Sequence, residues 1–211
     1  SAGNQYGRYS SFAYDVMKNA PAYYVKYAEV CFLRAEGAIR GWNMGGTAEQ
    51  FYNEGIRNAY VEDPSLISSS PYSTLVANYI QKDKPTAYVQ KDPMGGEDWP
   101  SLTKIGVKWN ESDDREVKLE KIITQKYIAL FPLSTEAWTE LRRTGYPKLF
   151  NVLNADDGDG SLQYGDIIRR IPWNATDPIT KGNIEATGLN ALGGEDLQST
   201  RLWWDVNTPN F

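Results

Sequence analysis

The sequence contains no histidine among its 211 residues. This absence excludes Ser-His-Asp and Cys-His catalysis and most zinc sites, because histidine is the base in the first two and a common zinc ligand. Cys31 is the only cysteine, so no disulfide bond can form within the chain, and its place on an apolar helix stripe predicts a buried thiol. No stretch approaches the ~20 apolar residues that cross a bilayer. Carboxylate chemistry, metals with oxygen ligands and non-catalytic binding remain open.

Basic residues are also in the minority. The formal net charge of −5 argues against a nucleic-acid partner, because neutralising phosphates requires a surplus of lysine and arginine. Hydrophobic residues make up 41% of the chain and aromatic residues 13%, which is enough for the core of one good-sized domain. We therefore predict a single domain over residues 1–211.

The clearest periodicity lies in LEKIITQKYIALFPLSTEAWTELRRTGYP, residues 119–147. Its apolar positions recur at three- and four-residue steps on both sides of Pro132, which predicts two helices separated by a tight break. Ser134 or Thr135 can cap the second helix, and Gly145 with Pro147 ends it. The pattern predicts a helical hairpin over about residues 115–145, built to pack against other helices.

A second helical hairpin is predicted over about residues 23–62. Its first helix carries small and large apolar residues on one face, and Gly41 offers a left-handed stop. Thr47 and Gln50 then form a capping box for the next helix. Gly55 lies on the apolar stripe of that helix, where it would allow a neighbouring helix to approach closely.

The rest of the chain lacks long periodic segments. We predict a loop insertion at 63–114, with a short helix at 70–82 and a strand at 104–109, where apolar residues alternate. The tail at 150–211 is rich in Gly, Asn, Asp and Pro, which predicts long ordered loops wrapped over the helices. Its expected anchors are aromatic or aliphatic: Trp173, Leu202, Trp203 and Trp204. The fold class is therefore mainly α, with tetratricopeptide-like helical hairpins, long ordered loops and at most a small β element.

Seven tryptophans and fourteen tyrosines suggest a sugar-binding protein. Saccharides present apolar C–H faces and hydroxyl groups, so their sites combine aromatic platforms with polar side chains. Most of the aromatics are expected to fill the core instead, including Trp42, Trp138, Trp203 and Trp204. Loop aromatics are the better ligand contacts. We select Trp99, in the glycine-flanked segment GGEDWPS, together with Tyr88 and Trp109.

Two acidic patterns are candidates for a catalytic carboxyl pair and for a calcium site. Glu136 and Glu140 share a helix face, but nearby arginines favour ordinary ion pairing over the opposed carboxyl groups of a glycosidase. The loop NADDGDGSLQYGD resembles a calcium loop, yet its first ligand position falls on Ala155 and Asp166 replaces the usual glutamate. An exposed turn is the preferred interpretation. We expect no catalytic residue, no metal and no cofactor.

Four separated motifs carry a family resemblance. They are YAEVCFLRAEGAIRGW, ITQKYIALF with EAWTELRRTGYP, IIRRIPW, and RLWWD, and together they cover most of residues 20–205. The order and the residues of these motifs resemble those of the SusD/RagB family of surface glycan-binding lipoproteins. Where the family usually continues IIRRIP with a tyrosine-proline pair and a glutamate, this chain has Trp173, Asn174 and Ala175. The segment GGEDLQSTRLWWD is closer to the nutrient-binding subgroup than to the founding starch binder.

The resemblance implies a C-terminal portion of a longer protein, because family members are normally about twice this long and begin with a lipid-attached cysteine that is not in this chain. It implies a cell-surface lipoprotein of the outer membrane, and a SusC-like TonB-dependent transporter as partner. We predict non-catalytic capture of an oligosaccharide and its delivery to that transporter.

Two alternatives remain at this stage. A glycan-processing enzyme, a glycosidase or lyase, would need two opposed acids, with Glu97, Asp98 and Asp114 as candidates. A tetratricopeptide adaptor would instead bind peptides in a concave polar face.

Overall fold

The computed structural model describes residues 14–19, 21–61, 72–91, 96, 98–151, 158–163, 165–173, 176–206 and 209–211. Contacts divide the chain into two compact units: Ser1–Glu140 with Tyr146–Phe150 and Phe211, and Leu141–Gly145 with Asn151–Asn210. The single domain expected over residues 1–211 stays a prediction. In the described part of the chain, every helix is too short or too polar to cross a bilayer.

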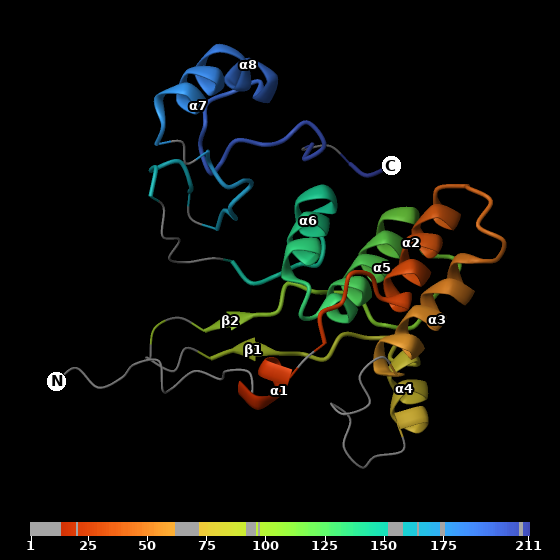
Figure 1. Ribbon diagram of the computed structural model, residues 1–211. Coiled ribbons are helices and arrows are strands. Elements are labelled where there is room, and N and C mark those ends of the chain that lie inside the picture. The colour runs from red at the N-terminus through yellow and green to blue at the C-terminus, as the bar shows by residue number, and fades with distance from the viewer. Residues whose placement is uncertain are drawn as a thin grey trace. The chain divides into compact units, whose positions relative to one another are not determined.

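Unit 1 is built on helices, as predicted (Figure 1). A short helix α1 (Tyr14–Asn19) precedes α2 (Tyr27–Ile39), and α3 (Ala48–Val61) packs along α2. The predicted capping box at the start of α3 is present, because the Thr47 amide donates to Gln50 Oε1 at 2.9 Å and the Gln50 amide donates to Thr47 Oγ1 at 3.2 Å. Cys31 is buried on α2, as expected.

The second hairpin supplies the other half of the core. Helix α5 (Arg115–Leu130) begins at Asp114, whose carboxylate accepts a hydrogen bond from the Val117 amide at 2.8 Å. Helix α6 (Ser134–Thr144) follows after Pro132. Helix α5 packs against both α2 and α3, and a set of fully buried apolar side chains fills the space between them: Ala28, Phe32, Ala35, Ile56, Leu119, Ile122 and Ile123.

The insertion contains helix α4 (Tyr72–Ile80) and one antiparallel ribbon of β1 (Val89–Gln90) and β2 (Trp99–Pro100). The helix confirms the prediction, whereas the strand expected at 104–109 is wrong. There the amides of Val107 and Lys108 both donate to the carbonyl of Lys82, at 2.7 and 2.8 Å, and the Val107 carbonyl accepts from Tyr52 Oη. These backbone groups are satisfied by single contacts, so no strand pairing forms.

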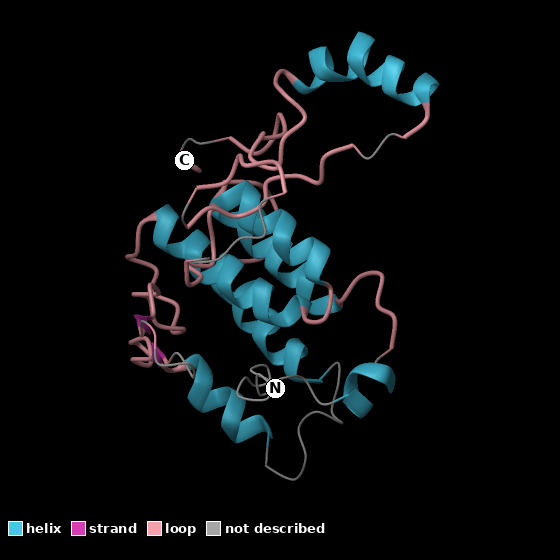
Figure 2. Cartoon of the chain, turned by 90° about the vertical axis from the view of Figure 1, so that its left-hand side faces the viewer, coloured by secondary structure: helices cyan, strands magenta, loops and turns pink. Residues whose placement is uncertain are grey.

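Unit 2 differs from the loops expected in the tail. It holds α7 (Pro178–Asn183), a π-helical turn η3 (Ile184–Gly188) and α8 (Leu189–Leu192), which form one helical run in Figure 2. Asp177 caps this run by accepting from the Thr180 amide at 2.8 Å. Hydrogen bonding by the Thr180 side chain, and next by this amide, lowers the pKa of Asp177. None of these helical residues is buried, so the run has no apolar stripe that the sequence could reveal.

Two tryptophans lie where the sequence did not place them. Trp203 was expected to anchor the tail, but 89% of its surface is exposed. Trp42 was expected to pack, and 63% of its surface is exposed. Trp204, in contrast, has its ring 4.7 Å from the guanidinium carbon of Arg142 within unit 2. Composition identifies aromatics that could fill a core, but it does not determine which of them do so.

Candidate functional site

The ribbon β1–β2 places two of the three selected aromatics on one face. Its register pairs Gln90 with Trp99, and the Ser101 amide extends the pairing by donating to the Tyr88 carbonyl at 2.8 Å. Because side chains alternate along a strand, Tyr88, Gln90, Trp99 and Ser101 lie on the same face. Tyr88 and Trp99 are diagonal neighbours across the ribbon, about 7–8 Å apart at the backbone, which is within reach of aromatic side chains.

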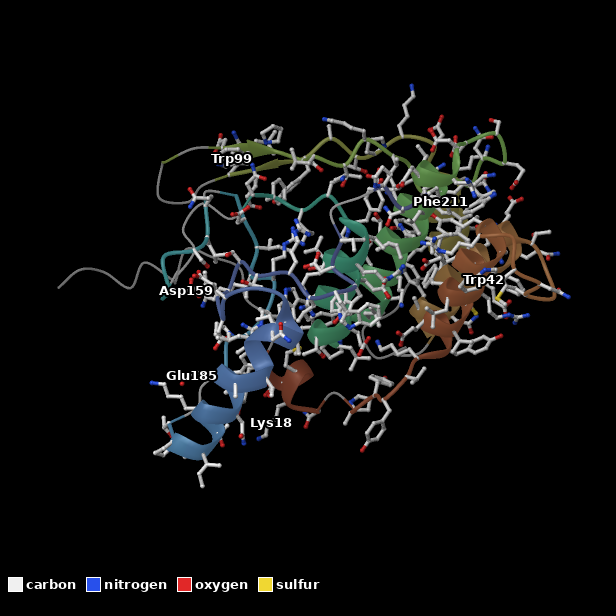
Figure 3. The ribbon with its side chains drawn as sticks, turned by 90° about the horizontal axis from the view of Figure 1, so that it is seen from above. Lys18, Trp42, Trp99, Asp159, Glu185 and Phe211 are labelled. Carbon is white, nitrogen blue, oxygen red and sulfur yellow. The ribbon has the colours of Figure 1, made fainter. Side chains whose placement is uncertain are left out.

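The Tyr88 ring is accessible and held in place. It is 56% exposed, and its centroid lies 6.2 Å from that of Phe150, with the two planes at 58°. The Tyr88 hydroxyl lies 3.3 Å from Gln90 Oε1, to which it donates. Trp99, labelled in Figure 3, is partly buried at the start of β2. The ion pair between Lys91 and Asp98 closes the ribbon beyond them.

A small open cleft of about 180 Å³ borders this ribbon. Thr86, Ser101 and Thr103 line it from the ribbon side, and Thr124 and Gln125 line it from α5. Ser101 joins the cleft to the aromatic pair, because it lines the cleft and lies on the same face of the ribbon as Tyr88 and Trp99. The Thr124 hydroxyl oxygen is buried and has no hydrogen-bond partner among the described residues. The arrangement offers an apolar ring surface beside polar groups.

The third selected aromatic is placed differently. Trp109 is only 5% exposed, and its ring centroid lies 5.1 Å from that of Tyr52 in the core. Its indole N–H donates to Glu111 Oε2 at 2.8 Å. The structure brings Tyr88 and Trp99 together and keeps Trp109 apart from them, so only the first two enter the proposal below.

Three of the acids considered for catalysis have partners of their own. Glu140 is buried and pairs with Lys126 at 2.8 Å, while Glu136 is exposed. Asp114 caps α5, and Asp98 pairs with Lys91. Glu97 lies outside the described residues.

The acidic loop is a turn where it is described. Asp159 accepts from the amides of Ser161 and Gln198, and Asp166 accepts from the Gln163 amide. Residues 152–157 and 164 lie outside the described residues, and the rest of the described chain holds no group of three or more potential metal ligands. Residues 158–160 and 166 of this loop are exposed.

The tail motifs build a charged scaffold inside unit 2. The amides of Arg169 and Arg170, in IIRRIPW, both approach the Gln198 carbonyl, at 2.8 and 3.4 Å. Asp205, in RLWWD, accepts from Arg169 and Arg201, and Arg170 pairs with Asp196. The sequence singled out these motifs for their resemblance to a family. Their contacts show that they hold unit 2 together, a role that only the three-dimensional pairing reveals.

Comparison with known proteins identifies the class. A family model described as "Susd and RagB outer membrane lipoprotein" matches residues 2–205. A chitin-binding SusD homologue from Flavobacterium johnsoniae is 43% identical, with a TM-score of 0.74, over 87% of this chain and 36% of the other. A SusD homologue from Bacteroides uniformis is 36% identical, with a TM-score of 0.76, over 89% and 38%. One from Bacteroides ovatus is 40% identical, with a TM-score of 0.69, over 85% and 37%.

The chain therefore belongs to the SusD/RagB family of outer membrane lipoproteins. It spans a little over a third of the length of these solved relatives. No curated protein matches it significantly. The predicted family, the mainly helical fold and the outer-membrane placement are confirmed.

Proposed function

We propose that this protein captures an oligosaccharide at the cell surface without breaking it and delivers it to a SusC-like TonB-dependent transporter. The observation that carries the proposal is the pair Tyr88 and Trp99 on one face of the β1–β2 ribbon, beside a cleft lined by hydroxyl and amide groups. An aromatic surface can stack against the C–H face of a sugar, while the threonine and glutamine side chains bond its hydroxyls. The transporter partner is supported by family membership alone.

The ligand class is supported by one relative in particular. The homologue from Flavobacterium johnsoniae, which is 43% identical, is described as chitin-binding. Oligomers of N-acetylglucosamine are therefore the first ligands to test, within a wider panel of neutral and acidic oligosaccharides. Their acetamide groups would find donors and acceptors in a cleft that contains Ser101, Thr103 and Gln125.

The test is a binding screen of the protein at its natural length, followed by product analysis of each bound sugar after long incubation. We expect binding with every oligosaccharide returned intact. Shortened or unsaturated products would overturn non-catalytic capture and favour a glycan-processing enzyme. Absence of binding across the panel would overturn the ligand class.

Matched variants locate the site. We expect Tyr88→Ala and Trp99→Ala each to weaken binding by about tenfold, equivalent to ~1.4 kcal/mol. The controls are Tyr24→Ala and Trp203→Ala, which remove aromatics that are 97% and 89% exposed and do not belong to the ribbon. Equal affinities for all four variants would show that the ribbon is not the binding surface.

A further inference from the structure

Trp42 presents an exposed indole at the C-terminal end of α2. Gly41 has a left-handed backbone with φ of +86°, and the Trp42 amide donates to the Gly37 carbonyl at 2.9 Å, which completes a Schellman motif at the end of α2. In such motifs the residue at Trp42's position commonly packs on the side chain at the position of Gly37. Glycine offers no side chain there, so the ring lies against bare backbone and 63% of Trp42 stays exposed.

The Trp42 ring lies close to the backbone of Gly37. A Cβ added to Gly37 would lie 3.3 Å from Trp42 Cε3 and 2.6 Å from the Met44 sulfur. The Trp42 ring thus occupies space that a side chain at position 37 would need, and 63% of Trp42 is exposed. An exposed indole beside polar and charged groups offers a stacking surface to a ligand that carries apolar C–H faces and hydroxyl groups.

The indole borders a cleft of about 600 Å³, which is larger than the one beside the ribbon. Its walls come from the end of α2, the start of α3 and the first turn of α5, all within unit 1. Besides Trp42, the polar lining residues are Thr47, Glu49, Glu111, Arg115 and Lys118. The cleft combines one aromatic platform with hydroxyl, carboxylate and cationic groups.

The cleft is lined by two cationic and two anionic side chains, and one of each is used in an ion pair within the lining. Lys118 and Glu111 satisfy each other at 2.8 Å. Arg115 and Glu49 form no ion pair with the described residues, and the Arg115 guanidinium stacks 4.6 Å from the Phe211 ring centre. Stacking of this kind restrains a guanidinium while its N–H groups remain able to donate. One cationic donor and one anionic acceptor suit a neutral ligand whose groups both donate and accept.

We propose that the Trp42 cleft is a second saccharide-binding surface, in which a neutral hexose ring stacks on Trp42 and its hydroxyls bond Glu49, Arg115 and Thr47. Hydroxyl groups are the groups that can satisfy a carboxylate and a guanidinium together. The proposal rests on the proposed function for its ligand class, but its residues are separate from Tyr88 and Trp99. Two surfaces on one chain would increase avidity for a long oligosaccharide.

The test uses the protein at its natural length, labelled with 5-fluorotryptophan and titrated with oligomers of N-acetylglucosamine and the other neutral oligosaccharides of the panel. Trp→Phe variants assign the resonances. In the Trp99→Ala background we expect the Trp42 resonance to shift saturably as saccharide is added. In the same background, Trp42→Ala should weaken binding to the Trp42 cleft about tenfold, and Trp42→Phe should preserve it. Calorimetry should resolve two sites in the natural protein, and each single alanine variant should make one of them about tenfold weaker.

The outcomes separate this proposal from the proposed function. Binding with one site that Trp42→Ala leaves unchanged would overturn the second surface and leave capture at the ribbon intact. A Trp42 resonance insensitive to both saccharide and a soluble quencher would show the indole to be covered in the natural protein, and would overturn it as well. Binding lost in Trp42→Ala but unchanged in Tyr88→Ala and Trp99→Ala would support the Trp42 cleft and overturn the ribbon site.

Discussion

The ammonium of Lys126 lies 2.8 Å from the carboxylate of Glu140, and both side chains are buried between α5 and α6. A second carboxylate, that of Glu29 on α2, lies 3.5 Å from the same ammonium. Lys126 is only 2% exposed. One buried cation therefore joins three helices by holding two negative charges, which explains why a lysine occupies the apolar stripe of α5.

Lys126→Met should destabilise the protein strongly. The substitution removes the ammonium and leaves the two buried carboxylates of Glu29 and Glu140 without a counter-charge. We therefore expect the free energy of unfolding to fall by about 3–5 kcal/mol. Denaturant unfolding measures the loss. The control is the triple variant with Glu29→Gln and Glu140→Gln, which removes the charges and should recover most of the stability. A loss below about 1 kcal/mol in the single variant would contradict the buried network.

Asp205→Asn should loosen unit 2. Asp205 is 1% exposed, and its Oδ1 accepts from Arg201 Nη1 at 2.6 Å and Arg169 Nη1 at 3.2 Å. Removing the charge weakens two charge-assisted hydrogen bonds from guanidinium groups that are 22% and 36% exposed, at a cost of about 1–3 kcal/mol. Hydrogen exchange of the amides of Arg169 and Arg170 should accelerate, because both approach the Gln198 carbonyl.

The matched control lies in the same unit. Glu185 pairs with Lys181 at 3.9 Å on an exposed helix, and Figure 3 labels Glu185 there. Glu185→Gln should change stability by less than about 0.5 kcal/mol, as expected for an exposed pair. If the Asp205 and Glu185 variants exchanged at the same rate, the scaffold role of Asp205 would be wrong.

Gly55→Ala should destabilise, although alanine is the better helix former. A Cβ at Gly55 would lie 2.8 Å from two ring atoms of Phe32, and Phe32 is fully buried on α2. We expect a loss of about 1–3 kcal/mol from overpacking. Gly182→Ala is the control, since nothing lies within 4 Å of its added Cβ, and it should gain roughly 0.5–1 kcal/mol in thermal or denaturant unfolding. Two shifts of the same sign would contradict this account.

The helices of unit 1 could be predicted because burial imposes a period on the sequence. Residues such as Phe32 and Ile122 repeat at helical spacing, and the close approach at Gly55 was readable from its place on the stripe. The run from Pro178 to Leu192 buries none of its residues, so no such period marks it. The available signals were its ends, with Asp177 before Pro178 at the start and the left-handed Gly193 after Leu192.

The candidate sites depend on contacts that a sequence does not encode locally. Tyr88 and Trp99 could be selected as loop aromatics, but their common face follows from a strand register set by the whole insertion. Trp109 looks similar in sequence and is buried against Tyr52. Trp42 looks like a packing residue and is exposed, because its expected contact position is Gly37. Exposure was therefore the property that residue type failed to predict.

Acid should selectively weaken the contact between the start of α5 and the core. Glu111 accepts hydrogen bonds from Lys118 Nζ and from the Trp109 indole, each at 2.8 Å, and these bonds lower its pKa below the ordinary value of 4.5. A carboxylate with a lowered pKa stabilises the fold above its unfolded pKa, and this contribution is lost as the pH falls through the folded value. The free-energy difference between the natural protein and Glu111→Gln should therefore be present at neutral pH and fade below about pH 4.5.

The size of this difference is limited by solvent, because Glu111 lies at the surface, so we expect less than about 1 kcal/mol at pH 7. Urea unfolding at a series of pH values measures it, and Trp109 emission reports the loss of the indole hydrogen bond. A difference that stayed constant from pH 7 to pH 3 would mean that glutamine loses a steric contact and that ionisation is irrelevant. A difference that grew in acid would have the wrong sign for a carboxylate stabilised by Lys118.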